Sequence, residues 1–137
     1  MASAAAAHGQ MQKAEELIQR SARVSDRLGF KETTADTQAG FAVAQAGVKN
    51  NSKARELAAS SSALAHGRSN MESVAVALAM TGDIVRAQAI ADDLSHRFPD
   101  DTLLHLVSIP FVRALIELNR NNPDAAIHSL QAPRRTS

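Results

Sequence analysis

Four alanines recur along this chain at nearly regular intervals, and they constrain its fold more than any other feature. They are Ala14, Ala54, Ala87 and Ala126, separated by 40, 33 and 39 residues. Each lies between a turn-like segment and a helix-like run, in GQMQKAEELI, KNNSKARELA, GDIVRAQAIA and NNPDAAIHSL. A repeat of about 34–40 residues is typical of stacked helical hairpins, which need their neighbours to bury an apolar face. The spacing therefore predicts an array of two-helix units.

The composition supports an all-α fold. The chain has 137 residues, of which 45% are hydrophobic and only 3% aromatic, and alanine is abundant. This length suits one domain with a substantial core. Alanine has the highest helix propensity and lets helices approach closely. We expect a single helical repeat domain over residues 1–131 and a flexible tail over residues 132–137.

Apolar residues at helical spacing predict about eight helices in four pairs. The expected ranges are 2–8, 11–28, 33–48, 52–65, 70–80, 83–97, 102–119 and 123–130. Within pairs, breaks are expected at Gly9-Gln10 and near 49–51, 81–82 and 120–122.

Glycine, serine and proline residues mark the expected helix ends. Gly29 is placed to follow a helix C-terminus, and Ser52 to cap a helix N-terminus. Pro99 is expected to end a helix, and Pro123 lies in the first turn of the last one. Pro110 falls inside a helical pattern, where it should kink the helix or mark a restart.

These residues resemble the tetratricopeptide repeat over roughly residues 9–131. That family places a small residue in the first helix of each unit opposite an alanine in the second. If Ala54, Ala87 and Ala126 are the second-helix alanines, the first-helix positions hold Ala42, Ala75 and Ala114. The Gly82-Asp83 turn and Pro99 also match. The resemblance implies a right-handed superhelix of about three to four TPR-like units.

A second resemblance is to the helical-repeat tail of bacterial, especially acidobacterial, Ser/Thr protein kinases. It rests on the AMTGD turn, the segment from Ala91 to Thr102 that contains F-P-D-D-T, and the IPFVRA segment at 109–114. The chain has no glycine-rich phosphate loop, H-R-D or D-F-G of a kinase. The resemblance implies a regulatory or partner-recruiting segment.

The repeat resemblance also implies a binding groove lined by the first helix of each unit. The residues it assigns to the groove are Asp36, Val43, Glu72, Val76, Met80, Phe111, Leu115 and Leu118, with Ala39, Ala46 and Ala79 beside them. Such a groove is largely apolar and lacks the Lys, Arg and Asn donors that capture a peptide carboxylate. It suits an amphipathic helix or a subunit face. The alternative is that neighbouring helices of the same chain fill it.

No arrangement of residues predicts catalysis or a metal site. The chain has no cysteine, so thiol chemistry is excluded. The five histidines lack the spacing of metal ligands. Asp92-Asp93 and Asp100-Asp101 are adjacent pairs whose side chains diverge, so surface and capping roles are expected. We therefore expect a non-enzymatic protein without cofactor or metal.

The remaining functional expectations concern partners. A net charge of +1 gives no field that attracts nucleic acid. The chain lacks a signal peptide pattern and a 20-residue apolar run, which favours a cytoplasmic protein without membrane contact. We expect a protein–protein interaction scaffold, and a homodimer formed through an uncapped apolar end. The alternative is a sensor that binds an apolar small molecule in a void lined by Val76, Met80 and Phe111.

Overall fold

The computed structural model describes residues 4–28 and 30–131, with side chains from 7 to 24 and from 30 to 131. Within these ranges the chain forms seven α-helices and one π-helical segment, and no strand. The elements are α1 (Ala4–Leu28), α2 (Lys31–Gly47), α3 (Asn51–Leu64), α4 (Arg68–Met80), α5 (Ile84–Arg97), η1 (Leu104–Ser108), α6 (Ile109–Asn119) and α7 (Pro123–Gln131). The prediction of an all-α protein is confirmed.

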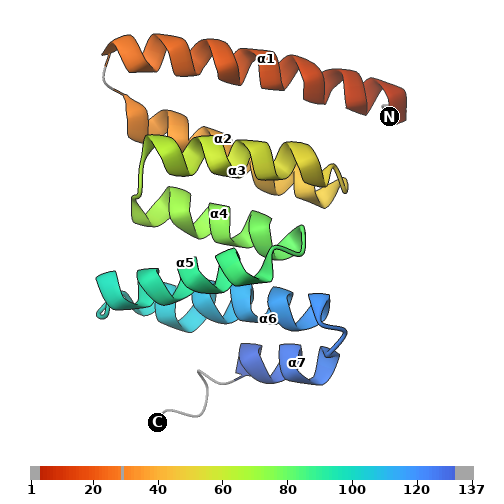
Figure 1. Cartoon of the computed structure of the whole chain (residues 1–137), viewed down its shortest axis with the longest axis vertical. Helices are drawn as coiled ribbons and strands as arrows, with labels where there is room; N and C mark the ends of the chain where they lie inside the picture. The colour runs from red at the N-terminus through yellow and green to blue at the C-terminus, as the bar shows by residue number, and fades with distance from the viewer. Residues whose placement is uncertain (1–3, 29, 132–137) are drawn as a thin grey trace.

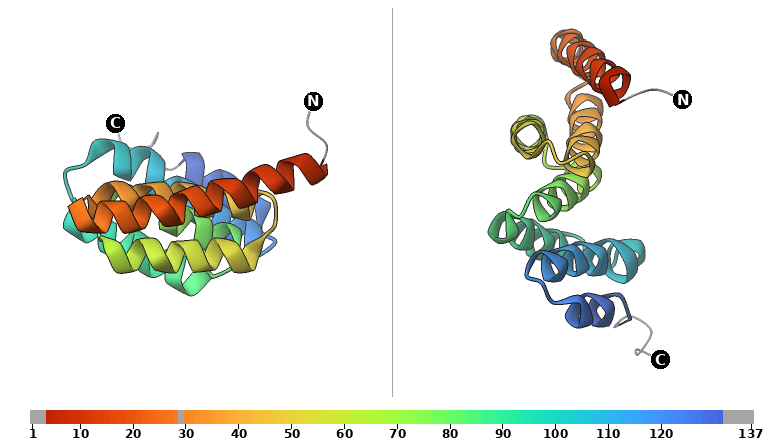
Figure 2. Two further views of the ribbon diagram at one scale, coloured as in Figure 1. Left: turned by 90° about the horizontal axis from the view of Figure 1, so that it is seen from above. Right: turned by 90° about the vertical axis from the view of Figure 1, so that its right-hand side faces the viewer.

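The helices follow one another along the long axis of the molecule in chain order, from α1 at one end to α7 at the other (Figure 1). Helices α2, α4 and α6 pack against one another in succession. Helix α3 contacts both α2 and α4, and α5 contacts both α4 and α6. The side view in Figure 2 shows α3 lying beside the row that contains α2 and α4. The α2–α3 hairpin is therefore covered by α4, and the α4–α5 hairpin by α6.

The alanines predicted to lie between paired helices are buried. Ala42, Ala54, Ala75 and Ala87 are 0% exposed, and Ala114 and Ala126 are 4% exposed. A methyl side chain allows the backbones of packed helices to approach closely. Ala14, the first alanine of the period, is only partly buried on α1. The other three alanines of the period, Ala54, Ala87 and Ala126, mark buried positions in the fold.

One turn geometry joins the helices of three hairpins. Lys49, Gly82 and Asn121 follow α2, α4 and α6, and their φ angles are 62°, 88° and 62°. In each turn the N–H of this residue donates to a carbonyl three residues back, and the next N–H donates to a carbonyl five residues back. The six N···O distances lie between 2.8 and 3.2 Å. This is a Schellman motif, which satisfies the last carbonyls of a helix. It recurs at the alanine period, so the repeat exists in the backbone as well as in the sequence.

The residue after each left-handed position immediately precedes the next helix. Its carbonyl accepts a hydrogen bond from the N–H of the buried alanine four residues on, in the pairs Asn50–Ala54, Asp83–Ala87 and Asn122–Ala126, at 3.0–3.1 Å. The turn therefore fixes where the alanine lies in the second helix. The expectation that Ser52 caps α3 is wrong, because Asn50 already occupies the N-cap position.

The predicted break at Gly9-Gln10 is also wrong. Helix α1 runs without interruption from Ala4 to Leu28, so the two expected helices are one, and the described residues hold seven helices rather than eight. Glycine within a helix costs only about 0.5–1 kcal/mol relative to alanine. The helix-favouring residues on both sides of Gly9 offset this cost.

The expected disturbance at Pro110 takes the form of a π-helical turn. In η1 the pattern shifts, and the Ile109 N–H donates to the Leu104 carbonyl, five residues back. Pro110 then lies in the first turn of α6, where its missing N–H is tolerated. The other proline predictions are confirmed, since α5 ends just before Phe98-Pro99 and α7 begins at Pro123. Gly29 and the predicted tail at 132–137 lie outside the described residues.

Candidate functional site

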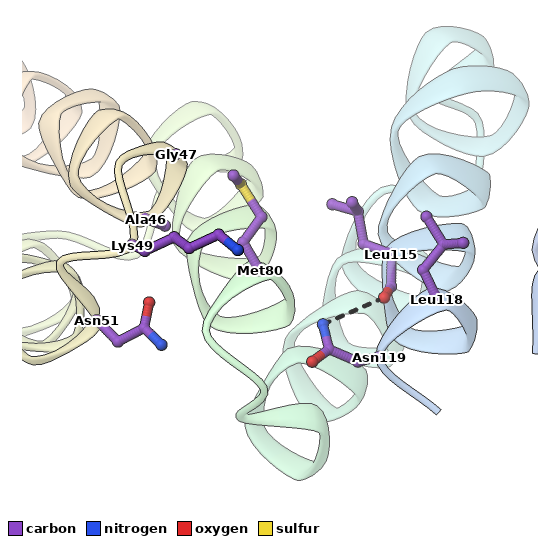
Figure 3. A pocket seen from close by; sticks show the side chains of 8 residues that line it. All are labelled: Ala46, Gly47, Lys49, Asn51, Met80, Leu115, Leu118 and Asn119. Atoms are coloured by element: carbon purple, nitrogen blue, oxygen red, sulfur yellow. Dashed lines mark hydrogen bonds between the residues drawn. The ribbon is translucent and has the colours of Figure 1, made fainter. Parts of the chain in front are cut away.

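The C-terminal ends of α2, α4 and α6 meet around an open pocket of about 450 Å³. Its lining comes from these three helices, from the turn between α2 and α3, and from the first residue of α3 (Figure 3). The lining residues are Ala46, Gly47, Lys49, Asn51, Met80, Leu115, Leu118 and Asn119. Residues far apart in the sequence therefore form one concave surface.

The end of α4 is held in place from both sides. Arg55 on α3 donates from Nη2 to the Thr81 carbonyl at 2.9 Å. Asn119 on α6 donates from Nδ2 to the Ala79 carbonyl at 2.5 Å. These bonds satisfy carbonyls that the end of a helix leaves without intrahelical partners. Met80 lies between the two bonded carbonyls, so its side chain projects from a fixed piece of backbone.

The pocket combines an apolar wall with a polar rim. In Figure 3, Lys49 and Met80 reach toward each other on one side, while Leu115, Leu118 and Asn119 stand on the other. The side chain of Lys49 is exposed and makes no ion pair with any side chain that the structure describes. This surface can accept an apolar side chain, and the Lys49 ammonium can bind an adjacent carboxylate.

The structure brings together three of the residues predicted for the groove, namely Met80, Leu115 and Leu118. Val43, Val76 and Leu115 occupy equivalent positions on α2, α4 and α6, and all three are partly buried against the main core. They support the inner face and offer only part of their surface to a partner. The open pocket lies at the ends of these helices.

The other predicted residues lie outside the pocket. Asp36 is exposed on α2, and Phe111 is about half exposed on α6. Glu72 lies beside Arg68, with Oε2 3.2 Å from Nη1, so its charge is already offset.

Three alanines also assigned to the groove differ in their exposure. Ala39 and Ala79 are fully buried, whereas Ala46 is 6% exposed and forms a small part of the pocket wall. The prediction that Ala39 and Ala79 offer contact surface is wrong, because their small side chains are used where successive first helices pack together.

Sequence reasoning missed the polar rim, formed by Lys49, Asn51 and Asn119. These residues lie in or beside the hairpin turns, which were interpreted only as breaks. The sequence did contain a signal for this rim. Lys49, Gly82 and Asn121 occupy the same position in the three hairpin turns. Aligning the turns as well as the alanines would have placed Lys49 and Asn119 at the same end of the molecule.

Polar groups elsewhere have structural roles. His96 Nδ1 lies 3.0 Å from the Asp92 carbonyl, and His105 Nε2 lies 2.9 Å from the Phe98 carbonyl. Asp101 accepts a hydrogen bond from the Leu104 N–H at 3.0 Å, which confirms the expected capping role.

In the part of the chain that the structure describes, no three His, Asp or Glu side chains gather as metal ligands. In the same part, every helix is too short or too polar to cross a bilayer.

The chain was compared with protein-family models, with curated proteins and with solved structures. None of the three comparisons gave a significant match.

Proposed function

We propose that this chain is a non-catalytic protein–protein interaction module, in which a TPR-like superhelix presents its inner face to a partner. The observation that carries the proposal is the 450 Å³ pocket at the ends of α2, α4 and α6. Its Met80 and Leu115 walls suit a large apolar side chain, and Lys49 on its rim suits an acidic group next to that side chain. The partner class is therefore a peptide or helix that carries both.

Two features support the repeat architecture. The Schellman turns after α2, α4 and α6 have the same hydrogen bonds, and they follow the alanine period. The first helices α2, α4 and α6 pack in succession, whereas the second helices contact the flanking first helices. This connectivity is typical of solenoids, whose units contact only their neighbours.

The resemblance of residues 79–131 to kinase tails gives the module a biological setting. In this proposal the chain recruits a substrate or a regulator for a Ser/Thr kinase. Sequencing the gene upstream of Met1 tests this part, because a kinase domain in the same reading frame is expected.

The pocket is tested by changing its walls. We expect Met80→Glu and Lys49→Glu to weaken the binding of a protein partner that has been identified by affinity purification from the native cells. Met80→Glu places a charge against the partner's apolar side chain, and Lys49→Glu reverses the charge on the rim. Each should raise Kd on the order of tenfold or more, about 1.4 kcal/mol, in titration calorimetry with the purified partner.

The matched control is Val85→Glu, which adds the same charge at a side chain on α5 that is 82% exposed and does not line the pocket. Val85→Glu should leave Kd unchanged. The proposal fails if no partner is enriched relative to the Met80→Glu protein, or if all three variants bind equally well.

A second pocket favours the alternative function, a sensor of an apolar small molecule. It measures about 430 Å³ and lies between α3 and α5, with Met71, Val74, Leu78 and Ile90 among its lining residues. Arg55 and Arg86 also line it, so an apolar molecule with an anionic group fits best. This pocket is not the void predicted for a sensor, which would be lined by Val76, Met80 and Phe111. The 430 Å³ pocket contains none of these residues, and the 450 Å³ pocket contains only Met80.

Mass spectrometry of the protein under native conditions distinguishes the two functions. A sensor should retain a bound small molecule that is lost in Arg86→Glu, which reverses an exposed charge at the edge of this pocket, and its protein partners should not respond to Met80→Glu. A scaffold should show the opposite pattern.

A further inference from the structure

A third cavity lies between α1 and the turn that joins α2 to α3. It measures about 660 Å³, more than either pocket described above. Residues 7–15 of α1 form one wall, and the end of α2, the turn and the first turn of α3 form the other. The cavity shares only Lys49 with the pocket of the proposed function. We call this space the α1 cavity.

Gln45, in the last turn of α2, brings a buried amide to the α1 cavity. Its side chain is 3% exposed, lines the cavity and makes no hydrogen bond with any group that the structure describes. The backbone fixes its position, because the Gln45 carbonyl accepts from the Asn50 N–H at 2.9 Å. A buried amide without a partner destabilises a fold. Gln45 therefore points to a ligand that supplies the missing hydrogen bonds.

Asn50 turns its side chain to the same cavity instead of capping its own helix. It precedes α3 as Asn122 precedes α7. Asn122 Oδ1 accepts from the Ala125 N–H at 3.3 Å, whereas the Asn50 side chain makes no cap hydrogen bond and lines the cavity. The first turn of α3 holds no acidic residue, so no local carboxylate offsets the positive end of this helix. This wall of the cavity thus combines amide groups with a helix N-terminus.

The charges at the α1 cavity favour an anion. Glu15 is the acidic residue in its wall, and Glu15 Oε1 lies 2.6 Å from Lys53 Nζ, so this carboxylate is already paired. Lys49 also lines the cavity, and its exposed side chain forms no ion pair within the described part of the chain. The Lys49 ammonium therefore remains available to a ligand, beside the amides of Gln45 and Asn50.

We infer that the α1 cavity binds a small organic anion, a phosphate or carboxylate that also has an apolar part. The anionic group accepts hydrogen bonds from the Lys49 ammonium and from the amides of Gln45 and Asn50. Met11 on α1 and Val48 just after α2 form an apolar wall for the rest of the molecule. A volume of 660 Å³ exceeds what an inorganic ion fills, so the organic part contributes to binding.

The test is an NMR titration of the full isotope-labelled chain with phenyl phosphate, benzoate and phenol. We expect at least one of the two anions to shift the amide signals of Gln45, Asn50 and Lys53 in a saturable way. Phenol has the ring without the charge and should leave these signals unchanged. The anion that binds more tightly identifies the anionic group. The inference is overturned if neither anion shifts these amides, or if phenol shifts them equally.

Two buried glutamines on α2 make a matched pair of variants. Gln38 is 7% exposed and its Oε1 has no partner among the described residues, but it does not line the α1 cavity. Gln45→Leu should raise the Kd of the tighter-binding anion on the order of tenfold, and Gln38→Leu should leave it unchanged. Neither should lower the melting temperature, because each replaces an incompletely bonded buried amide with an apolar side chain of similar size. Equal effects of the two variants on Kd overturn the inference.

Lys49→Gln is a second variant, at an exposed position where folding is not at risk. It should also weaken binding of the anion, whereas Lys31→Gln, at the opposite end of α2, should not. An anion that binds Lys49→Gln as tightly as the wild type overturns the inference. Met80→Glu should leave the Kd of the anion unchanged, and Gln45→Leu should leave the Kd of the protein partner unchanged. A failure of the proposed function and a failure of this inference are therefore distinguishable.

Discussion

At the residue scale, the hairpin turns hold different side chains in one left-handed conformation. Gly82 adopts it without strain at φ 88°, whereas Lys49 adopts it at φ 62° with a side chain. A left-handed residue with a Cβ costs about 1–2 kcal/mol. We therefore expect Gly82→Ala to lower the free energy of unfolding by about 1–2 kcal/mol, and Lys49→Gly to raise it by up to about 1 kcal/mol. Urea denaturation measures both.

Gly40 provides the control for this prediction. It lies within α2, and an added Cβ there would meet nothing within 4 Å. Gly40→Ala should raise the free energy of unfolding by about 0.5–1 kcal/mol, because alanine is the better helix former. If Gly82→Ala and Gly40→Ala stabilise the protein equally, the left-handed turn is absent.

A second prediction at this scale concerns two neighbouring serines on α3. Ser61 is 0% exposed, and its Oγ donates to the Ala35 carbonyl on α2 at 2.7 Å. Its Oγ also accepts from Asn70 Nδ2 on α4 at 3.2 Å, so one hydroxyl joins three helices. Ser61→Ala should lower the free energy of unfolding by about 1–2 kcal/mol, because the buried Asn70 loses an acceptor. Thermal and urea denaturation check the value.

Ser60 is the matched control, since it is exposed on the same helix. Ser60→Ala should change the free energy of unfolding by less than about 0.5 kcal/mol. An equal loss for both serines would contradict the three-helix contact.

At the scale of elements, Asp101 joins the start of the helical segment before α6 to α4. Its Oδ1 accepts from the Leu104 N–H at 3.0 Å, and its carboxylate also binds Arg68. The Leu104 hydrogen bond, and then the one from Arg68, lower the pKa of Asp101 below its ordinary 3.8. A carboxylate whose pKa is lower in the folded than in the unfolded state stabilises the protein at every pH above its unfolded-state pKa. This stabilisation is lost as the pH falls through the folded-state pKa.

Asp101→Asn should therefore be less stable than the wild type at neutral pH. The difference should begin to narrow as the pH falls below about 4, the pKa of the unfolded chain, and should keep narrowing until the pH has passed the lower pKa of the folded carboxylate. Urea denaturation over a pH series measures it. Asp100→Asn is the control, because Asp100 is exposed and should give no such pH-dependent difference. A difference that stays constant down to pH 2 would contradict the role of the charge.

The helix boundaries and part of the pocket could be predicted from the sequence. The breaks after α2, α4 and α6 were predictable, because turn residues interrupt strong helical periodicity there. The break predicted at Gly9 was wrong, because one glycine does not end a helix that the residues on both sides favour. The rim of the pocket was not predictable from local pattern, since Lys49 and Asn119 meet only after three hairpins stack. Met80 and Leu115 were found because the repeat register already relates first helices to one another.

At the scale of the whole molecule, stability is set by which helices have neighbours on both sides. Helix α4 contacts α2, α3, α5 and α6, and it supplies much of the main core. Helix α1 packs mainly on α2, and Ile18 is its one buried side chain among residues 7–24. An ion pair between Glu15 Oε1 and Lys53 Nζ at 2.6 Å adds a contact between α1 and α3. In an array of this kind, each unit is stabilised chiefly by its neighbours.

Hydrogen exchange followed by mass spectrometry should therefore show a gradient along the chain. Amides of α1 are expected to exchange fastest, by local opening of a helix with one main neighbour, and amides of α4 slowest. Lys53→Ala should accelerate exchange in α1, because it removes the ion pair with Glu15, and should leave α4 unchanged. Equal protection of α1 and α4 would mean that the helices open together as one unit, which a chain of nearest-neighbour contacts does not permit.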